Sequence, residues 1–248
     1  MKLKKILVIG ATSAIATECV RRWSDQPVEL VLVGRSDERL QRLSRDLSVR
    51  SPLSKVQTVT LDFTAPTSIQ TFMDDQAKDG PIDLAMIAHG SLPEQNECQE
   101  NLSCVDQALV LNGVSPALFA EAIAAEMIEQ GRGTLVVVGS VAGDRGRKSN
   151  YIYGAAKGLL ERYVEGLQHR LHNSGVTLCL VKPGPTHSPM TAHLVDSGLP
   201  LAELSEVADV IVKGVDKGKA VIYAPGKWAV IMWVIRHLPR FVFNRLDI

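Results

Sequence analysis

Short apolar runs alternate along this chain with longer stretches in which apolar residues recur every three or four positions. Each short run is rich in Ile, Val and Leu, as expected of a parallel strand that is covered on both faces. The longer stretches have the spacing of amphipathic helices. The runs predict strands at residues 5–9, 28–33, 55–61, 82–88, 134–138, 177–181 and 220–224. The stretches predict helices at residues 14–23, 37–47, 68–77, 103–129, 151–172, 189–197 and 204–216, with a loop at 93–99.

This regular alternation predicts an α/β fold. Strands that alternate with helices form a doubly wound parallel sheet with helices on both faces. The chain has 248 residues, of which 46% are apolar and 22% charged, so a large core is expected and disorder is not. No break in composition divides the chain. We therefore expect one domain at residues 1–224 and an apolar C-terminal extension of that domain at residues 225–248.

Small and polar residues gather where the predicted strands end. In an open α/β sheet, ligands bind beyond the carboxyl ends of the strands. A binding site is therefore expected along this edge. The strands end at Gly10, at Gly34-Arg35, at Asp62, at Ala88-His89-Gly90, at Ser140 and at Pro183-Gly184.

Tyr153 and Lys157 lie one turn apart in the predicted helix at residues 151–172. Residues i and i+4 of a helix share one face, and an ammonium beside a phenol lowers the phenol pKa from its usual value of about 10. Such a tyrosine exchanges a proton near neutral pH. Tyr151 has no such partner, because Ala155 stands four residues on. A Tyr and a Lys at this spacing are usually plain surface residues, so the pair gains meaning only from the strand ends around it.

The strand-end motifs resemble those of the short-chain dehydrogenase/reductase family, and the resemblance covers essentially the whole chain. The family's T-G-x-x-x-G-x-G turn corresponds to Ile9-Gly10-Ala-Thr-Ser-Ala14-Ile-Ala16. Its N-N-A-G motif corresponds to Ile87-Ala88-His89-Gly90, and its P-G-x-x-x-T segment to Pro183-Gly184 with the following Thr186 and Ser188. The resemblance implies a Rossmann-type sheet and an NAD(P)(H)-dependent oxidoreductase, which transfers a hydride between a nicotinamide and a carbonyl or secondary alcohol.

The family's catalytic tetrad is matched in full. By similarity, its four places are taken by Asn112, Ser140, Tyr153 and Lys157. The resemblance implies that Ser140 hydrogen-bonds the carbonyl oxygen and that Tyr153 donates a proton to the developing alkoxide. Lys157 would lower the Tyr153 pKa and hold the ribose hydroxyls. Asn112 would support a proton path through water.

The implied cofactor contacts follow the strand ends. An arginine after the second strand accepts the 2′-phosphate of NADP, whereas an acidic residue there binds the 2′-hydroxyl of NAD. Because Arg35 stands at this place, NADP(H) is favoured and NAD(H) is the alternative. The expected cofactor-binding residues are Gly10, Thr12, Ser13, Ala14, Ile15, Arg35, Asp62, Phe63, Ala88, Gly90, Tyr153, Lys157, Pro183, Gly184, Thr186 and Ser188.

Two motifs depart from the family pattern. Ala14 and Ala16 replace glycines of the first turn, and Ala14 adds a methyl group near the expected pyrophosphate. His89 stands in the fourth-strand motif, where it either faces the cofactor or, as we favour, is a histidine at the edge of the core. These departures leave a second class of function open, a dinucleotide-binding sensor or scaffold without turnover. The intact tetrad favours the enzyme.

The C-terminal extension combines aromatic and basic residues. Residues 226–245 hold two of the three tryptophans and two of the five phenylalanines, and their Lys and Arg residues meet no acidic residue before Asp247. This composition predicts a helix pair broken at Pro239. We favour a role as a dimer contact or as a flap over the substrate pocket. The alternative is a segment that lies on a membrane surface. The membrane interpretation would suit a lipid-linked substrate.

Charge and cysteine content exclude several classes. Lys plus Arg and Asp plus Glu both number 27, and no basic patch contains interleaved aromatics, so nucleic acid is not an expected partner. Cys19, Cys98, Cys104 and Cys179 fit no metal-binding spacing, and we expect four reduced thiols and no metal. No stretch has the roughly 20 consecutive apolar residues of a spanning helix. We expect a cytoplasmic protein, or one peripheral at the inner membrane surface.

The substrate pocket is expected among three variable segments: the loop after Gly90, residues 144–149, and the segment after Ser188. Met190 and Leu194 favour an apolar, roomy pocket, and no cluster of charged residues demands a charged substrate. We predict an NADPH-dependent ketoreductase of a bulky apolar or lipid-linked carbonyl compound. Family resemblance also implies a homodimer or homotetramer built on the helices that begin at Ser103 and Tyr151.

Overall fold

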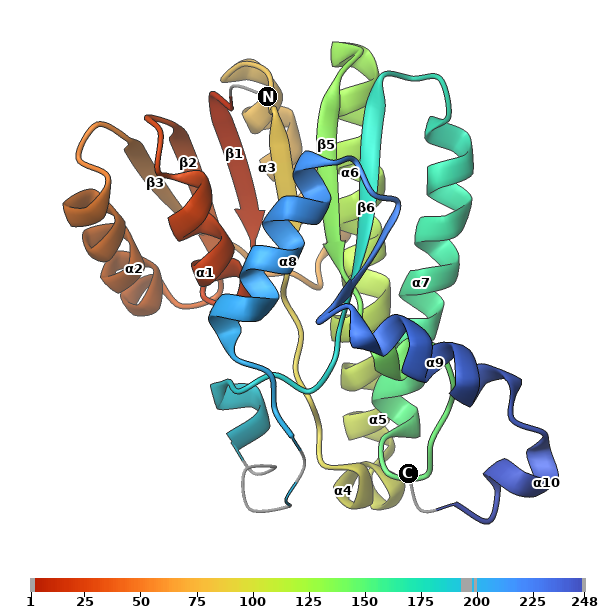
Figure 1. Cartoon of the computed structure of the whole chain (residues 1–248). Helices are drawn as coiled ribbons and strands as arrows, with labels where there is room; N and C mark the ends of the chain where they lie inside the picture. Colours follow the sequence, from red (N-terminus) through yellow and green to blue (C-terminus); the bar gives the residue numbers. More distant parts are fainter. Residues whose placement is uncertain (1–2, 193–197, 199, 247–248) are drawn as a thin grey trace.

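The computed structural model describes residues 3–192, 198 and 200–246. Within these residues, seven parallel strands form one sheet in the order β3-β2-β1-β4-β5-β6-β7 (Figure 1). The predicted α/β fold is therefore confirmed. The strands are β1 (Lys5–Ile9), β2 (Glu29–Gly34), β3 (Lys55–Thr60), β4 (Leu84–Ile87), β5 (Gly133–Val138), β6 (Val176–Pro183) and β7 (Val221–Ala224).

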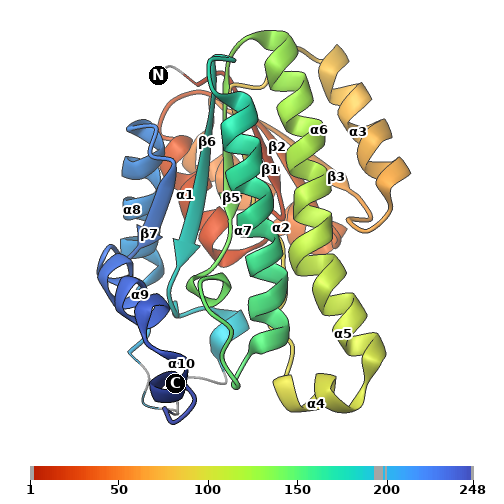
Figure 2. The same cartoon turned by 90° about the vertical axis from the view of Figure 1, so that its right-hand side faces the viewer.

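Helices cover both faces of the sheet (Figures 1 and 2). One face carries α1 (Ala14–Trp23), α2 (Asp37–Arg50) and α8 (Leu204–Asp216). The other carries α3 (Pro66–Lys78), α6 (Ser115–Gln130) and α7 (Tyr151–Leu171). Successive side chains of a strand point to opposite faces, so Leu30 and Leu32 of β2 join one core cluster while Val31 and Val33 join the other. Both layers need apolar residues, which is why the strands in the middle of the sheet are apolar throughout, whereas the edge strand β3 alternates polar and apolar residues.

The long helix predicted at residues 103–129 is divided. It consists of α5 (Leu102–Leu109), a π-helical turn at Val110–Val114 and α6, and Gly131 ends it with a φ of 67°. The whole run Leu102–Gln130 is long and apolar enough to cross a membrane, contrary to the sequence expectation. Its most apolar window is 56% buried inside the fold. A helix packed on a core can have the same composition as a spanning helix, and the α6 part of this run packs on the sheet beside α3 and α7 (Figure 2).

Two predicted segments differ from the structure. The stretch expected to be a loop contains α4 (Gln95–Glu100), a polar six-residue helix without an apolar repeat. It is fixed instead by Gln95, whose Oε1 accepts a hydrogen bond of 3.2 Å from the Ile152 N–H. The helix predicted at 189–197 begins as a 3₁₀ turn at residues 189–192, and its remainder, with Leu194, lies outside the described residues.

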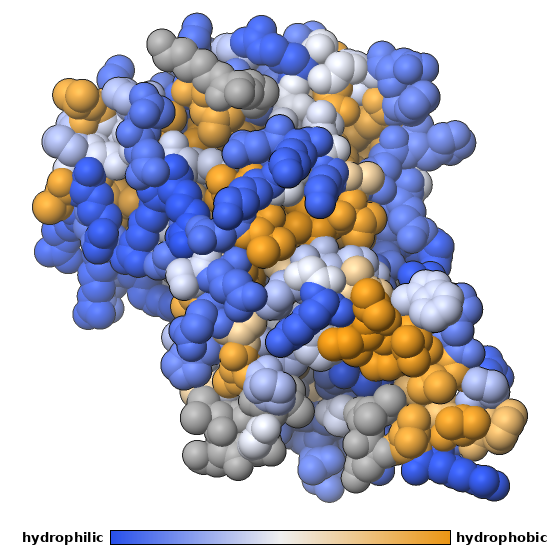
Figure 3. Space-filling model, viewed as in Figure 1, coloured by the Kyte–Doolittle hydropathy of each residue, from blue (hydrophilic) through white to orange (hydrophobic). Residues whose placement is uncertain are grey.

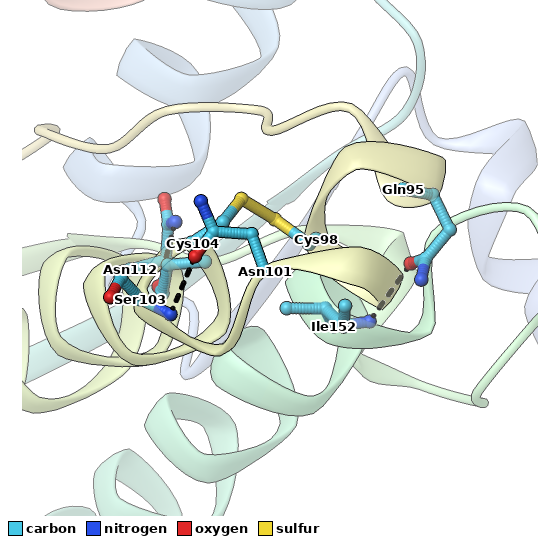
Figure 4. The surroundings of a disulfide bond; sticks show 8 residues. Gln95, Cys98, Asn101, Ser103, Cys104, Asn112 and Ile152 are labelled. Carbon is cyan, nitrogen blue, oxygen red and sulfur yellow. Dashed lines mark hydrogen bonds between the residues drawn. A yellow bond between two sulfur atoms is a disulfide. The ribbon is translucent and has the colours of Figure 1, made fainter.

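The expectation of four reduced thiols is wrong for two of them, because Cys98 and Cys104 form a disulfide (Figure 4). Asn101 separates α4 from α5, and its side chain accepts a hydrogen bond from the Ser103 N–H. The turn brings the two Cα atoms within 4.9 Å. Sequence spacing alone could not reveal this, because the pairing depends on a helix that the sequence pattern did not predict. Cys19 and Cys179 are free and buried, as expected.

The C-terminal extension forms the expected helix pair, α9 (Lys227–His237) and α10 (Arg240–Phe243), separated at Pro239. Both helices lie at the end of the molecule toward which the strands point (Figure 1). Arg145, from the loop after β5, contacts both helices of the extension. Its guanidinium donates hydrogen bonds to the carbonyls of Ile235 and Leu238 and lies 3.8 Å from the centroid of the Phe243 ring.

Candidate active site

The carboxyl ends of β1, β4, β5 and β6 open into one cavity. Most of the residues predicted to bind cofactor or substrate line it, although they come from distant parts of the chain. They are Ser13, Ile15, Ala88, Gly90, Ser140, Tyr153, Lys157, Pro183, Gly184, Thr186 and Ser188. Met190, expected in the substrate pocket, also lines the cavity.

The first turn begins at Gly10, and only glycine fits there. Its φ is 79°, and a Cβ at this position would come within 2.5 Å of the backbone nitrogen of His89. Gly10 thus lets the turn approach the end of β4. Thr12, Ser13 and Ala14 then lead into α1, where Ser13 makes no side-chain capping bond. The N-terminus of α1 therefore presents N–H groups to the cavity, which suits a pyrophosphate.

Two arginines flank this turn at the end of β2. Arg35 is exposed, and Arg39 donates a hydrogen bond of 3.3 Å to the Thr12 carbonyl. Arg39 was missed in the sequence, although a cation in the first turn of a helix opposes the helix dipole and so suggests a ligand. Asp62 is exposed beside them, and hydrogen bonds from Thr64 lower its pKa.

Phe63 and His89 belong to the core behind the turn. Phe63 is 2% exposed, and its ring centroid lies 4.6 Å from that of His89, so a Phe63 side-chain contact with the cofactor is not supported. Ser115 donates a hydrogen bond to the Phe63 carbonyl and therefore accepts one from His89 Nε2–H at 2.8 Å. Burial lowers the pKa of His89 to about 3, so the ring is neutral. Of the two interpretations of His89, these contacts favour a histidine at the edge of the core. The residue also borders the cavity.

Asn112 lies in the π-helical turn, a feature often found at functional sites. It is fully buried. Its Oδ1 accepts a hydrogen bond of 2.8 Å from the Ser91 N–H, and its Nδ2 donates one of 2.9 Å to the Ala108 carbonyl. Asn112 thus joins the helix to the segment after β4, directly behind Gly90.

Ser140 and Tyr153 meet because α7 approaches the end of β5 closely. A Cβ on Gly154 would lie 2.8 Å from the Ala142 carbonyl oxygen, so a larger residue would push the helix away. Ser140 lies close enough to Tyr153 to act on its pKa, and the Ser140 Oγ accepts a hydrogen bond of 3.1 Å from the Ala142 N–H. Lys157 lies one turn further along α7.

The predicted lowering of the Tyr153 pKa is not observed. Burial raises the pKa of Tyr153 to about 12, and the nearby Ser140 hydroxyl only opposes this rise. Lys157 does not offset the burial, because its Nζ donates a hydrogen bond of 2.9 Å to the Val138 carbonyl and lies 5.9 Å from the centroid of the Tyr153 ring. Burial also lowers the pKa of Lys157 to about 8.

The segment after β6 closes the cavity. Thr186 is buried and donates a hydrogen bond of 2.9 Å to the Gly184 carbonyl, while Ser188 pairs with Thr191. The indole of Trp228, from α9, lies directly on Gly184. A Cβ at that glycine would fall 1.9 Å from the indole nitrogen. The C-terminal extension therefore contacts the cavity wall.

Residues 4–197 match the model of the short chain dehydrogenase family. The chain belongs to this family of oxidoreductases. Over 252 residues it is 31% identical to an oxidoreductase of Streptomyces coelicolor encoded in the mprA 5′ region, covering 98% of this chain and 96% of that protein.

Solved members of the short-chain dehydrogenase family share the fold. A short-chain dehydrogenase from Sphingobium yanoikuyae in complex with NADPH superposes with a TM-score of 0.83 at 24% identity, over 96% of this chain and 97% of that one. A bulky-bulky ketone specific alcohol dehydrogenase from Comamonas testosteroni gives 0.81 at 22% identity, over 97% and 96%.

The cavity of this short-chain dehydrogenase contains one charged residue that the sequence reasoning did not single out. Arg147 lines it beside Asn150, and among the described lining residues only Arg147 and Lys157 carry an ionic charge. The expected loop at residues 144–149 does border the pocket, but the pocket is not free of charge. The only sequence signal was a basic residue within that loop.

Proposed function

We propose that this short-chain dehydrogenase is an NADPH-dependent ketoreductase. The proximity of Ser140 and Tyr153 supports this most directly, because both side chains line the cavity and Ser140 lies close enough to act on the Tyr153 pKa. Two adjacent hydroxyls can donate hydrogen bonds to one carbonyl oxygen.

Each residue of the tetrad then has a separate task. Ser140 holds the carbonyl oxygen, and Tyr153 transfers its proton to that oxygen as negative charge develops there. Lys157 is positively charged below a pH of about 8 and would hold the ribose hydroxyls of the cofactor, as the family resemblance implies. Asn112 fixes the segment after β4, along which the cavity extends.

A bound nicotinamide cofactor would supply the hydride. The residues of this chain fit such a cofactor, since Gly10 opens the first turn, the N-terminus of α1 borders the cavity, and Arg35 and Arg39 stand at the end of β2. The two arginines favour the extra phosphate of NADPH. The remaining predicted contacts, through Asp62 and through the Pro183 to Ser188 segment, belong to the same proposal. NADPH should bind more tightly than NADH, and equal affinity in a titration of both would contradict this preference.

Replacement of Tyr153 tests the proposed chemistry. A Tyr153→Phe variant should lose NADPH oxidation with ketones by about 10²- to 10⁴-fold, because it removes the general acid. NADPH affinity should remain. Tyr151→Phe is the matched control, since Tyr151 begins the same helix, is 45% exposed and does not line the cavity.

The alternative, a sensor without turnover, predicts a different result. The parent protein would then bind NADPH but oxidise it with no ketone of a broad panel. The Ala14 and His89 departures motivated this alternative. Neither blocks the cavity, since His89 is held in the core and Ile15, after Ala14, still lines the opening.

A bulky apolar or lipid-linked carbonyl compound is the substrate class we propose. Leu92, Val141 and Met190 line the cavity near Tyr153, and the similar protein from Comamonas testosteroni is named for bulky ketones. We further propose one catalytic domain at residues 1–224 with residues 225–248 as its extension, and assembly as a homodimer or homotetramer. Location in the cytoplasm or at the inner membrane surface is part of the proposal.

A further inference from the structure

Arg147 lies in the wall of the candidate active site and has no ion-pair partner among the residues that the structure describes. Within the described part of the chain, no carboxylate pairs with its guanidinium, and its Nε is buried without a hydrogen bond. Burial lowers the pKa of Arg147, opposed only by the charge of Asp144. A partly buried guanidinium that lacks an anion has lost water without gaining a counter-charge.

Asp144 cannot serve as that counter-charge. Its carboxylate is enclosed and accepts hydrogen bonds from the Lys182 Nζ and, at 3.1 Å, from the Tyr223 hydroxyl. Lys182 also binds Glu161. The nearby acidic residues are therefore committed to a network beneath the loop. Arg145, two residues before Arg147, is equally committed, because it holds the carbonyls of the C-terminal extension.

The position of Arg147 separates it from the expected pyrophosphate site. That site is formed by the turn after β1, whereas Arg147 follows β5, and β4 lies between these strands in the sheet. Adjacent strands lie about 4.8 Å apart, so the two strand ends are about 10 Å from each other. Arg147 instead shares its part of the cavity wall with Asn150, just before the helix that carries Tyr153. The Asn150 Oδ1 is also buried without a partner among the described residues.

We infer that Arg147 recognises an oxyanion group on the carbonyl substrate, namely a carboxylate, sulfonate or phosphate. The inference rests on the proposed ketoreductase function and narrows its substrate class. The guanidinium fork matches an oxyanion with two parallel hydrogen bonds. Asn150 adds an amide that can donate or accept beside it. The apolar walls take the rest of the molecule, so the substrate is an anionic compound with an apolar body.

Matched ketones test the inference. The substrates are acetophenones that carry a carboxylate, a sulfonate or a phosphate ester at the para position, each compared with the neutral methyl 4-acetylbenzoate. NADPH oxidation gives kcat/KM for each. The parent should prefer at least one anionic ketone, and Arg147→Met should reduce that anionic-to-neutral ratio roughly 30-fold, as expected for a lost charge-assisted contact. The three anions distinguish which oxyanion is preferred.

Two further variants sharpen the comparison. Arg147→Lys keeps the charge but not the fork, so its ratio should lie between those of the parent and Arg147→Met. Arg162→Met removes an exposed arginine of α7 that pairs with Glu165, and its ratio should equal that of the parent. An Arg147→Met ratio equal to that of the parent would overturn the inference. The inference would also be overturned if Arg147→Met loses NADPH affinity while its anionic-to-neutral ratio of kcat/KM stays unchanged. Arg147 would then belong to the cofactor site.

Calorimetry separates this inference from the proposed function. Binding of the anionic ketones to the NADPH-loaded protein is measured for the parent and Arg147→Met. Weaker binding by the variant supports anion recognition even if the parent oxidises no NADPH, a result that would contradict only the ketoreductase proposal. Equal binding by both proteins refutes anion recognition even if turnover is observed.

Discussion

The buried imidazole of His89 should make folding stability depend on pH. The unfolded chain takes up a proton near pH 6.5, whereas the folded protein resists it down to about pH 3. The contribution of His89 to the free energy of unfolding is therefore fully present above pH 6.5. It falls by about 1.4 kcal/mol per pH unit as the pH is lowered toward 3. His89→Gln keeps an N–H donor for Ser115 without the titration, and should flatten this part of the curve.

Urea unfolding at several pH values between 4 and 7 would measure the effect of His89→Gln. His169→Gln, which changes an exposed histidine of α7, serves as the control and should retain the parent slope. An unchanged slope in His89→Gln would mean that His89 is protonated equally in both states.

At the level of single residues, the sequence predicts where side chains gather but not how they are charged. Ser140, Tyr153 and Lys157 meet in one cavity because each follows a recognisable strand end or helix repeat. The direction of the Tyr153 pKa shift was not predictable, since it depends on burial that no spacing reveals. Arg147 escaped notice for the same reason: an unpaired guanidinium can be recognised only when its neighbours in space are known.

The approach of α7 to the Ser140 loop rests on a glycine contact that two parallel substitutions can measure. Gly154→Ala would place a methyl group 2.8 Å from the Ala142 carbonyl oxygen. It should lower the free energy of unfolding by about 1–3 kcal/mol and reduce ketone turnover, because the helix must shift away from Ser140. Gly166, in the same helix, has open space at this position. Gly166→Ala should raise stability by about 0.5–1 kcal/mol.

Thermal or urea unfolding of both variants, with kcat as a second measurement, decides whether the contact is essential. Similar stability changes in the two variants would show that Gly154 contributes helix propensity alone.

Secondary structure was predictable where a pattern spans many residues. Every predicted strand appears, with ends shifted by no more than two residues, because buried strands are apolar throughout and the half-exposed β3 alternates polar and apolar residues. The short polar helix α4 was missed because two contacts set its position. Gln95 bonds to Ile152, which is distant in the sequence, and a disulfide joins α4 to α5. Neither contact leaves a pattern in the local sequence. The π-helical turn at Asn112 was also hidden, since its composition does not differ from that of the flanking helices.

For the molecule as a whole, the outer face of α9 is the most prominent unexplained surface. Val230 and Trp233 are 68% and 64% exposed, and Phe241 of α10 is 69% exposed (Figure 3). The same segment carries Lys227, Arg236, Arg240 and Arg245, and no acidic residue lies in residues 225–246. Two copies of this face would oppose like charges, whereas an anionic lipid surface would attract them. We therefore propose membrane contact here over a dimer contact.

Vesicle flotation tests this surface. The protein should float with phosphatidylglycerol vesicles at low salt and much less with phosphatidylcholine vesicles. Val230→Ser combined with Trp233→Ser should reduce flotation about tenfold or more, because it removes the apolar insertion. Val49→Ser, at an equally exposed apolar residue of α2, is the control. The dimer contact would be established instead if neither protein floats, the parent is a dimer and the double substitution dissociates that dimer.

The contact between Trp228 and Gly184 gives the protein an optical probe of its own. Gly184 borders the cavity, and the indole lies against its backbone. The chain has two other tryptophans: Trp23 is buried at the C-terminal end of α1, and Trp233 of α9 is exposed. Indole emission overlaps the absorption of a reduced nicotinamide, and energy transfer falls steeply with distance. One of the three tryptophans therefore lies at the site and two lie away from it. Cofactor binding at this turn can be followed by the change in intrinsic tryptophan fluorescence, without any label.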